Sequence, residues 1–121
     1  MKVVIDTNAL MIPGQFGLDI VSEIEKLLPT AELVVIESTL RELKNIDDKK
    51  SASIAIQLIE KNEILVERVP GETDSAVITY AQQNKGVVFT NDKEMKKKCV
   101  QLRVPVMFLK KKRTIALEGF E

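Results

Sequence analysis

Short apolar runs rich in valine and isoleucine alternate along the chain with longer stretches in which apolar residues recur at helical spacing. The short runs predict strands at residues 3–6, 33–36, 64–67, 87–90 and 106–109. The longer stretches predict helices at about residues 20–28, 39–45, 50–61, 73–85 and 92–102. This alternation is typical of βα units, and it predicts an α/β fold with three layers (α/β/α) around a mainly parallel sheet of five strands.

The last two predicted helices carry distinctive residues. Gly86 follows the fourth helix, where a glycine in the left-handed conformation would end it. Met95, Cys99 and Leu102 share one face of the last helix, so Cys99 is expected to be a small core residue. No repeat or second domain boundary is visible, and residues 1–121 are interpreted as one domain.

Composition narrows the chemistry that this chain can perform. The 121 residues include no histidine and one cysteine, Cys99, which excludes histidine-based catalysis, histidine-rich metal sites and an internal disulfide. The single thiol, the lack of an apolar leader and the short apolar runs predict a cytoplasmic protein with no membrane partner. Any chemistry must therefore use carboxylates, hydroxyls, lysines or a bound metal.

The formal net charge is zero, which by itself argues against a nucleic-acid partner. The total conceals an asymmetry, because residues 1–84 carry −6, residues 85–113 carry +8 and residues 114–121 carry −2. An acidic body is thus followed by a basic segment. The cations that we expect to contact nucleic-acid phosphates are Lys96, Lys97, Lys110, Lys111, Lys112 and Arg113. For the lysines of the last helix, a solvated face is the competing interpretation.

Four acids are expected at one edge of the predicted sheet. Asp6 and Asp92 follow the first and fourth strands, Glu42 lies on the short helix after the second strand, and Asp74 opens the fourth helix. Ligands of open parallel sheets bind outside the carboxyl ends of the strands. A carboxylate cluster there suits Mg²⁺ or Mn²⁺, which can activate water and neutralise charge on a phosphodiester.

Three of these acids also have a purely structural interpretation. Thr39-x-x-Glu42 fits a capping box, Asp74 in a first turn is favoured by the helix dipole, and Asp92 fits the cap of its own helix. Asp6 is harder to explain in this way, because an acid that ends an apolar strand gains little from packing. The four acids together are more informative than any one of them.

The acids stand in motifs that resemble those of the PIN-domain nucleases. The motifs are Asp6-Thr7-Asn8, Glu42-Leu43, Asp74 and Thr90-Asn91-Asp92, in the family's order over nearly the whole chain. The resemblance implies strand order 3-2-1-4-5 and a metal-dependent ribonuclease that leaves a 5′ phosphate and a 3′ hydroxyl.

The same resemblance implies roles for individual residues. Asp6, Asp74 and Asp92 would be catalytic metal ligands, with Glu42 a direct or water-mediated one, and Asn8 and Thr90 would orient the carboxylates by hydrogen bonds. Crowding of the acids should raise some of their pKa values until a metal binds.

Two further segments resemble the branch of the family that acts in ribosome assembly and small-subunit rRNA processing. They are the loop that contains Pro13, Gln15-Phe16-Gly17 and Asp19, and the tail at residues 110–119. Gln15, Phe16 and Asp19 would either order this loop or form a partner surface. Two alternatives stay open: a VapC-type toxin ribonuclease, and an inactive RNA-binding assembly factor. The implied partners are RNA, a second copy of the chain and ribosome-assembly proteins.

Two other α/β enzyme classes fit the spacing less well. Haloacid-dehalogenase-type phosphatases need a second aspartate where this chain has Asn8. Receiver domains need an aspartate at the end of the third strand, and residues 66–70 contain none.

Overall fold

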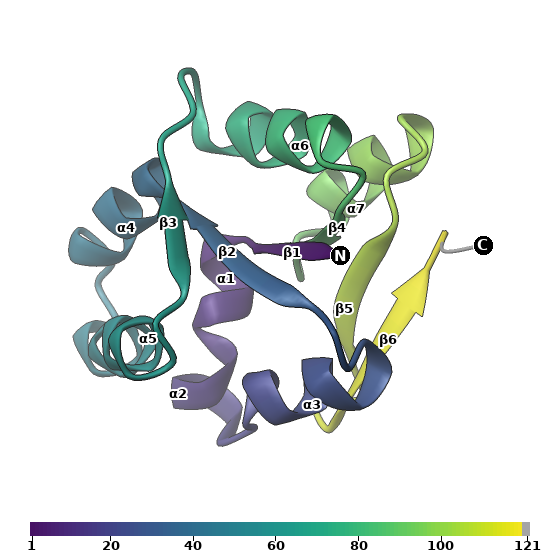
Figure 1. Ribbon diagram of the computed structural model, residues 1–121. Coiled ribbons are helices and arrows are strands. Elements are labelled where there is room, and N and C mark those ends of the chain that lie inside the picture. The colour runs from purple at the N-terminus through teal and green to yellow at the C-terminus, as the bar shows by residue number, and fades with distance from the viewer. Residues whose placement is uncertain (120–121) are drawn as a thin grey trace.

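The structure, a computed structural model, describes residues 1–119 and arranges their six strands in one sheet of order β3-β2-β1-β4-β5-β6 (Figure 1). The strands are β1 (Lys2–Ile5), β2 (Glu32–Ile36), β3 (Leu65–Glu67), β4 (Val87–Phe89), β5 (Val106–Lys110) and β6 (Thr114–Glu118). The first five are parallel, and β6 is antiparallel to β5. The predicted order of the parallel strands is confirmed, and the predicted count of five is wrong by one.

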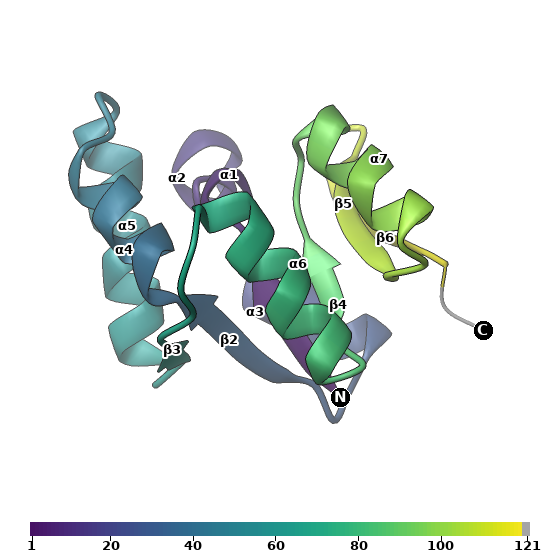
Figure 2. The ribbon, with the colours of Figure 1, turned by 90° about the horizontal axis from the view of Figure 1, so that it is seen from above.

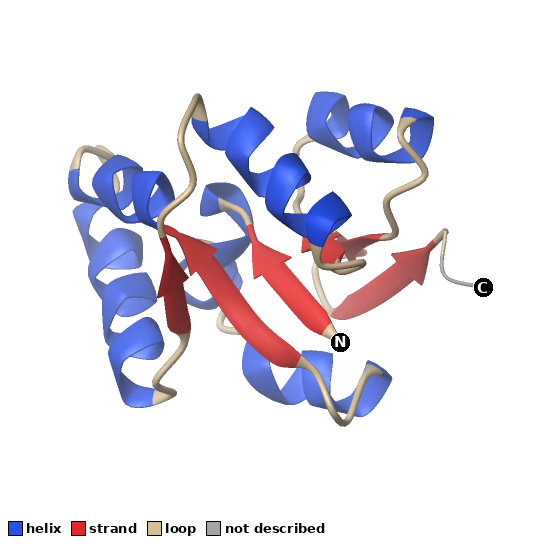
Figure 3. Ribbon diagram, turned by 45° about the horizontal axis from the view of Figure 1, so that its top comes forward, coloured by secondary structure: helices blue, strands red, loops and turns tan. Residues whose placement is uncertain are grey.

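Helices cover both faces of the sheet and complete the three predicted layers (Figure 3). They are α1 (Thr7–Leu10), α2 (Ile12–Phe16), α3 (Ile20–Leu27), α4 (Glu37–Lys44), α5 (Lys49–Lys61), α6 (Thr73–Gln83) and α7 (Lys93–Gln101). The cluster that contains α6 and α7 side chains is separate from the one that contains α2, α3 and α5 side chains, on the opposite face. Within residues 1–119, no helix is both long and apolar enough to span a bilayer.

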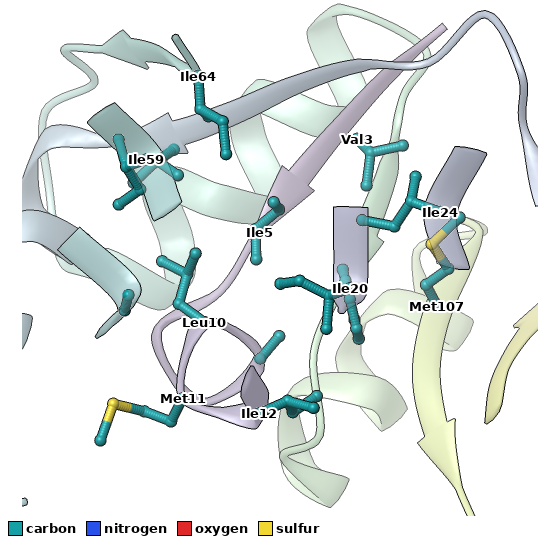
Figure 4. Close-up of a cluster of buried hydrophobic side chains, with 14 of the residues drawn as sticks. Val3, Ile5, Leu10, Met11, Ile12, Ile20, Ile24, Ile59, Ile64 and Met107 are labelled. Atoms are coloured by element: carbon teal, nitrogen blue, oxygen red, sulfur yellow. The ribbon is translucent and has the colours of Figure 1, made fainter. Parts of the chain in front are cut away.

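The central strand β1 is buried on both of its faces. Val3 and Ile5 pack into the larger apolar cluster with Ile20 and Ile24 of α3, as Figure 4 shows. Val4 packs into the cluster beneath α6 and α7. Successive side chains of a strand point to opposite faces, so an unbroken apolar run is what a strand covered on both sides requires. The residue that follows this run is Asp6.

The sixth strand escapes prediction because its turn lacks the usual hairpin residues. Tight hairpin turns favour asparagine and glycine, which accept positive φ at little cost. Here Lys111 (φ 54°) and Lys112 (φ 58°) adopt that conformation. Ile115 and Leu117 of β6 lie two residues apart and both pack into the larger apolar cluster, as the alternation of a strand requires.

The segment expected to be a loop after the first strand contains the two short helices α1 and α2. Pro13 lies in the first turn of α2, where its missing N–H costs nothing. Gly17 ends α2 with φ 68°, and its N–H donates to the carbonyl of Pro13 at 2.9 Å. Proline and glycine here bound a helix rather than an irregular loop.

Two expectations about the later helices are wrong in detail. The left-handed residue after α6 is Lys85 (φ 51°), and Gly86 has no positive φ. A Cβ on Gly86 would lie 2.6 Å from the carbonyl oxygen of Lys2, so the glycine permits close approach of β1 instead. Leu102 ends α7 half exposed and does not join Met95 and Cys99 in the core.

These roles predict opposite effects for neighbouring substitutions. Gly86→Ala should lower the free energy of unfolding by about 1–3 kcal/mol, because the new methyl group meets a backbone atom that cannot yield. Lys85→Gly should raise it by about 0.5–1 kcal/mol by relieving a left-handed lysine. Urea unfolding measures both values. A harmless Gly86→Ala would contradict the close approach.

Candidate active site

Asp6 lies just beyond the carboxyl end of β1, and only 3% of its surface is exposed. Its N–H donates to the carbonyl of Phe89 at 2.9 Å, which extends the pairing of β1 with β4. Its Oδ1 accepts from the Thr7 backbone N–H at 2.9 Å. Its Oδ2 accepts from Thr90 Oγ1 at 2.8 Å and Asn8 Nδ2 at 3.2 Å. The two central strands therefore hold this carboxylate in one orientation.

Thr90 and Asn8 link Asp6 to the loop between β4 and α7. Thr90 Oγ1, which donates its single hydrogen to Asp6, accepts from the Asp92 N–H at 3.1 Å. Asn8 Oδ1 accepts from the Asn91 N–H at 2.6 Å. These contacts have the geometry that an orienting role for Thr90 and Asn8 requires.

Asp92 caps α7, as its structural interpretation anticipates. Its Oδ1 accepts from the N–H groups of Glu94 and Met95 at 2.9 and 3.4 Å. Its Oδ2 accepts no hydrogen bond from residues 1–119. One oxygen of this carboxylate therefore stays available for a ligand while the other stabilises the helix.

The capping-box interpretation of Glu42 is wrong. Helix α4 begins at Glu37, so Thr39 lies inside the helix and its hydroxyl has no partner in the described part of the chain. Glu42 Oε1 accepts instead from Thr7 Oγ1 at 2.5 Å. This bond ties α4 to the residue that follows Asp6.

The four predicted acids line one hollow of about 380 Å³, which we call the acidic pocket. The residues that line it are Asp6, Thr7, Asn8, Met11, Gln15, Glu42, Ile46, Asp48, Asp74 and Asp92. Five of them are carboxylates and none is a lysine or arginine. The pocket is thus a concentration of negative charge at the point where the strand order reverses, between β1 and β4.

Sequence reasoning missed three of the polar residues around this pocket. Asp48 caps α5 by accepting from the Ser51 N–H at 3.1 Å, and hydrogen bonds from Ser51 lower the pKa of its carboxyl. The Thr7 hydroxyl donates to the Glu42 carboxylate. Asn91 Oδ1 accepts from the Leu109 N–H at 2.8 Å and so ties the loop to β5. The partners of Thr7 and Asn91 lie too far away in sequence to be predicted from spacing, whereas Ser51 lies only three residues after Asp48.

Burial raises the pKa of the Asp6 carboxyl, and the charges of Asp74 and Glu42 add to this effect. Hydrogen bonds from Thr90 and Thr7 oppose it in part. A raised pKa means that the folded protein binds the Asp6 proton more tightly than the unfolded chain does. The contribution of Asp6 to the free energy of unfolding therefore falls as the pH rises from 3.8, the ordinary pKa of an aspartate, through the raised pKa of the folded protein. Ionisation of the Asp6 carboxyl therefore costs stability in the folded protein.

The carboxylate oxygens of the acidic pocket are of the chemical type that binds a divalent cation, since Mg²⁺ and Mn²⁺ prefer such ligands. As the side chains stand, no three acids or thiols of residues 1–119 are arranged to hold a metal ion. Ligation therefore requires rotamer changes. The Asp74 carboxylate accepts no hydrogen bond from the described residues, so the side chain can turn without losing one.

The predicted RNA-binding cations fall into two groups. Lys110, Lys111, Lys112 and Arg113 are exposed at the turn between β5 and β6, which we call the basic turn. This turn lies at the same end of the molecule as α1, α2 and the start of α7 (Figure 2).

The two helix lysines lie apart from the acidic pocket. The Lys96 ammonium sits 3.6 Å from the centroid of the Phe108 ring and 3.6 Å from Glu118, and Lys97 lies 3.7 Å from Glu94. Lys96 and Lys97 border a different hollow, of about 540 Å³. Part of their charge is thus already paired.

The loop residues whose roles were open now have distinct positions. Asp19 caps α3, because its carboxylate accepts from the Ser22 N–H at 3.1 Å and the Ser22 hydroxyl at 2.9 Å. Gln15 lines the acidic pocket. The exposed Phe16 ring lies 5.9 Å from the Lys112 ammonium. Asp19 therefore orders the loop, while Gln15 and Phe16 face the acidic pocket and the basic turn.

The fold and the acidic pocket define an α/β protein with a carboxylate site at the switch point of its sheet. Residues 3–112 match the family described as the PIN-like domain, and the chain belongs to that family. The family resemblance seen in the motifs is thereby confirmed.

Two curated relatives match nearly the full chain. Ribonuclease VapC4 of Methanocaldococcus jannaschii is 34% identical, over 98% of this chain and 97% of its own length. Ribonuclease VapC9 of Archaeoglobus fulgidus is 29% identical, over 95% of this chain and 87% of its own. Among solved structures, the PIN domain endonuclease Utp24 superposes with a TM-score of 0.80 at 20% identity, covering 98% of this chain and 92% of that one, and shows the same fold. The preference for the ribosome-assembly branch is not confirmed by these relatives.

Thr90→Val should raise the pKa of Asp6 further, because it removes a hydrogen bond that favours the ionised carboxylate. It should also lower the free energy of unfolding at neutral pH by about 1–3 kcal/mol. That deficit should shrink on acidification below the Asp6 pKa. Carboxyl ¹³C NMR titration measures the pKa. Thr7→Val is the control, since it keeps the backbone donor to Asp6 and should leave this pKa nearly unchanged.

Proposed function

We propose that this protein is a metal-dependent endoribonuclease that hydrolyses RNA phosphodiesters at the acidic pocket. The observation that carries the proposal is the pocket itself, in which Asp6, Glu42, Asp74 and Asp92 meet with no cationic side chain to neutralise them. The names of the two curated relatives, both ribonucleases, support the same activity. A buried carboxylate with a raised pKa gains stability from a cation, which makes a divalent ion the fitting occupant.

In this proposal the acids divide the work by position. Asp6 is the anchored ligand, since Thr90 and Asn8 fix its orientation. Asp74 and the free oxygen of Asp92 complete the metal site, and Glu42 contributes directly or through water. When bound, Mg²⁺ or Mn²⁺ supplies a Lewis acid that activates water and offsets charge on the phosphodiester.

Asp6→Asn and Asp92→Asn should each lower cleavage of single-stranded RNA by at least about 100-fold with Mg²⁺ or Mn²⁺. The products of the unmodified protein should carry a 5′ phosphate and a 3′ hydroxyl. Asp19→Asn is the matched control, because it removes a carboxylate that caps a helix and lies outside the pocket. Cleavage by both pocket variants at the unmodified rate would contradict the proposal. If the protein binds RNA but does not bind metal and does not cleave RNA, it is the inactive assembly factor instead.

The basic turn supplies the cations that hold the RNA backbone beside the acids. None of its four side chains forms an ion pair with another residue of the described chain. Lys111 and Lys112 both have positive φ, which costs an L-residue roughly 1–2 kcal/mol each. Apart from the contact of Lys112 with the Phe16 ring, neither lysine has a partner among the described residues that offsets this cost, so we attribute their presence to phosphate binding.

Replacing these two residues by Lys111→Asn and Lys112→Gly should therefore separate stability from binding. The free energy of unfolding should rise by about 1–2 kcal/mol. RNA binding should weaken, and the slope of log affinity against log salt should flatten by up to about 1.4. Lys61→Gln, a loss of one cation at the far end of α5, should change neither slope nor stability by much. An unchanged slope in the turn variant would exclude phosphate contact there.

The RNA substrate has two candidates. Processing of ribosomal RNA is favoured by the loop and the tail, whose resemblance to the ribosome-assembly branch led to this hypothesis and which meet at Phe16 and Lys112. A toxin ribonuclease of the VapC type is favoured by the names of the curated relatives. Sequencing of RNA crosslinked to the protein distinguishes them, since ribosomal precursors should dominate in the first case.

A further inference from the structure

A second hollow, of about 670 Å³, opens beside the acidic pocket, and we call it the side hollow. The two share a wall formed by Thr7, Glu42 and Ile46. The hydrogen bond from Thr7 to Glu42 crosses this shared wall. If the reacting group of a polymeric substrate lies over the acids, the adjacent residue of that polymer can occupy the side hollow.

The side hollow is bordered by a buried hydroxyl without a partner. Ser38 lines it, is 8% exposed, and its Oγ makes no hydrogen bond with the described residues. Buried hydroxyls are nearly always hydrogen-bonded in folded proteins, and one left unpaired costs about 1–3 kcal/mol. Thr39 Oγ1 is also unpaired, but Thr39 lines neither hollow. Of the two residues with an unpaired buried hydroxyl, only Ser38 lines either of these hollows.

Backbone donors border the same hollow. Gly71, Glu72 and Thr73 line it at the start of α6, an 11-residue helix. Glu72 occupies the N-cap position, yet its side chain accepts no hydrogen bond from the first turn. The N–H groups of that turn therefore remain available, as at any uncapped helix start.

Charge decides which part of an RNA this hollow suits. Its single cation, Arg41, donates to Glu37 at 2.9 Å, and Glu42 and Glu72 place two carboxylates on the wall. A phosphate would meet a net negative surface. A neutral base and ribose would find hydrogen-bond donors and the apolar wall of Ile46 instead.

We propose that the side hollow binds the nucleoside adjacent to the scissile phosphodiester, with the Ser38 hydroxyl and the first-turn N–H groups of α6 as its polar contacts. This assignment rests on the proposed function for its place in the reaction. It makes the side hollow a source of base preference next to the cleaved bond.

Amide chemical shifts test the assignment without requiring cleavage. The four ribonucleoside 5′-monophosphates should shift the amides of Ser38 and of Thr73 to Ser75, with one base bound more tightly than the others. Ser38→Ala should weaken that preferred binding about 3- to 10-fold, the effect of one hydrogen bond. Thr39→Val, which removes the other unpaired hydroxyl, should leave binding unchanged. Equal weakening by both variants would overturn the role of Ser38.

Two further outcomes would overturn the proposal. Inorganic phosphate alone should not shift the amides of Thr73 to Ser75. Shifts there of the same size as with the nucleotides would make the side hollow a phosphate site. Unchanged nucleotide binding after Asn45→Trp, which places a ring in the hollow from an exposed position, would show that the nucleotides bind elsewhere. Because these titrations need no hydrolysis, absence of ribonuclease activity would count against the proposed function and not against this site.

Discussion

The rest of the site depends on one constraint, the burial of the Asp6 carboxylate between the two central strands. Its three hydrogen bonds come from Thr7, Asn8 and Thr90, which lie on both sides of the switch point. Such a group is costly to desolvate, and hydrogen bonds offset only part of that cost. The neighbouring acids increase the cost rather than reduce it. A cation bound beside Asp6 would offset this cost by stabilising the ionised carboxylate.

Negative and positive side chains gather in two separate groups at one end of the molecule. Carboxylates gather in the acidic pocket, while the exposed cations of the basic turn stand at the same end of the molecule. Strain falls on the turn, where two lysines occupy left-handed conformations. Phosphate could not approach the acids unaided, because like charges repel. In the proposed reaction a metal and the basic turn together reverse the field that RNA meets.

Prediction succeeded where a local signal is clear, and it failed where that signal is ambiguous or absent or where the partner is distant in sequence. Apolar runs such as residues 87–90 identified the five parallel strands to within a residue or so. The capping box at Thr39 failed because a spacing of three residues fits many helix positions, and the true partner of Glu42 is Thr7, 35 residues away. The sixth strand was missed because its turn uses Lys111 and Lys112 in place of glycine.

The pattern of apolar residues alone therefore determined the three layers and which acids follow the strands, and the resemblance of the motifs to the PIN-domain nucleases implied the order of the parallel strands. Only the tertiary structure decided how those acids are held. Thr90 reaches Asp6 across 84 residues, and Ser38 stands unpaired beside a hollow whose walls come from α4, α6 and the residue after Asp6. Hydrogen bonds and cavities form between segments that packing brings together, and no spacing along the chain encodes which atoms meet.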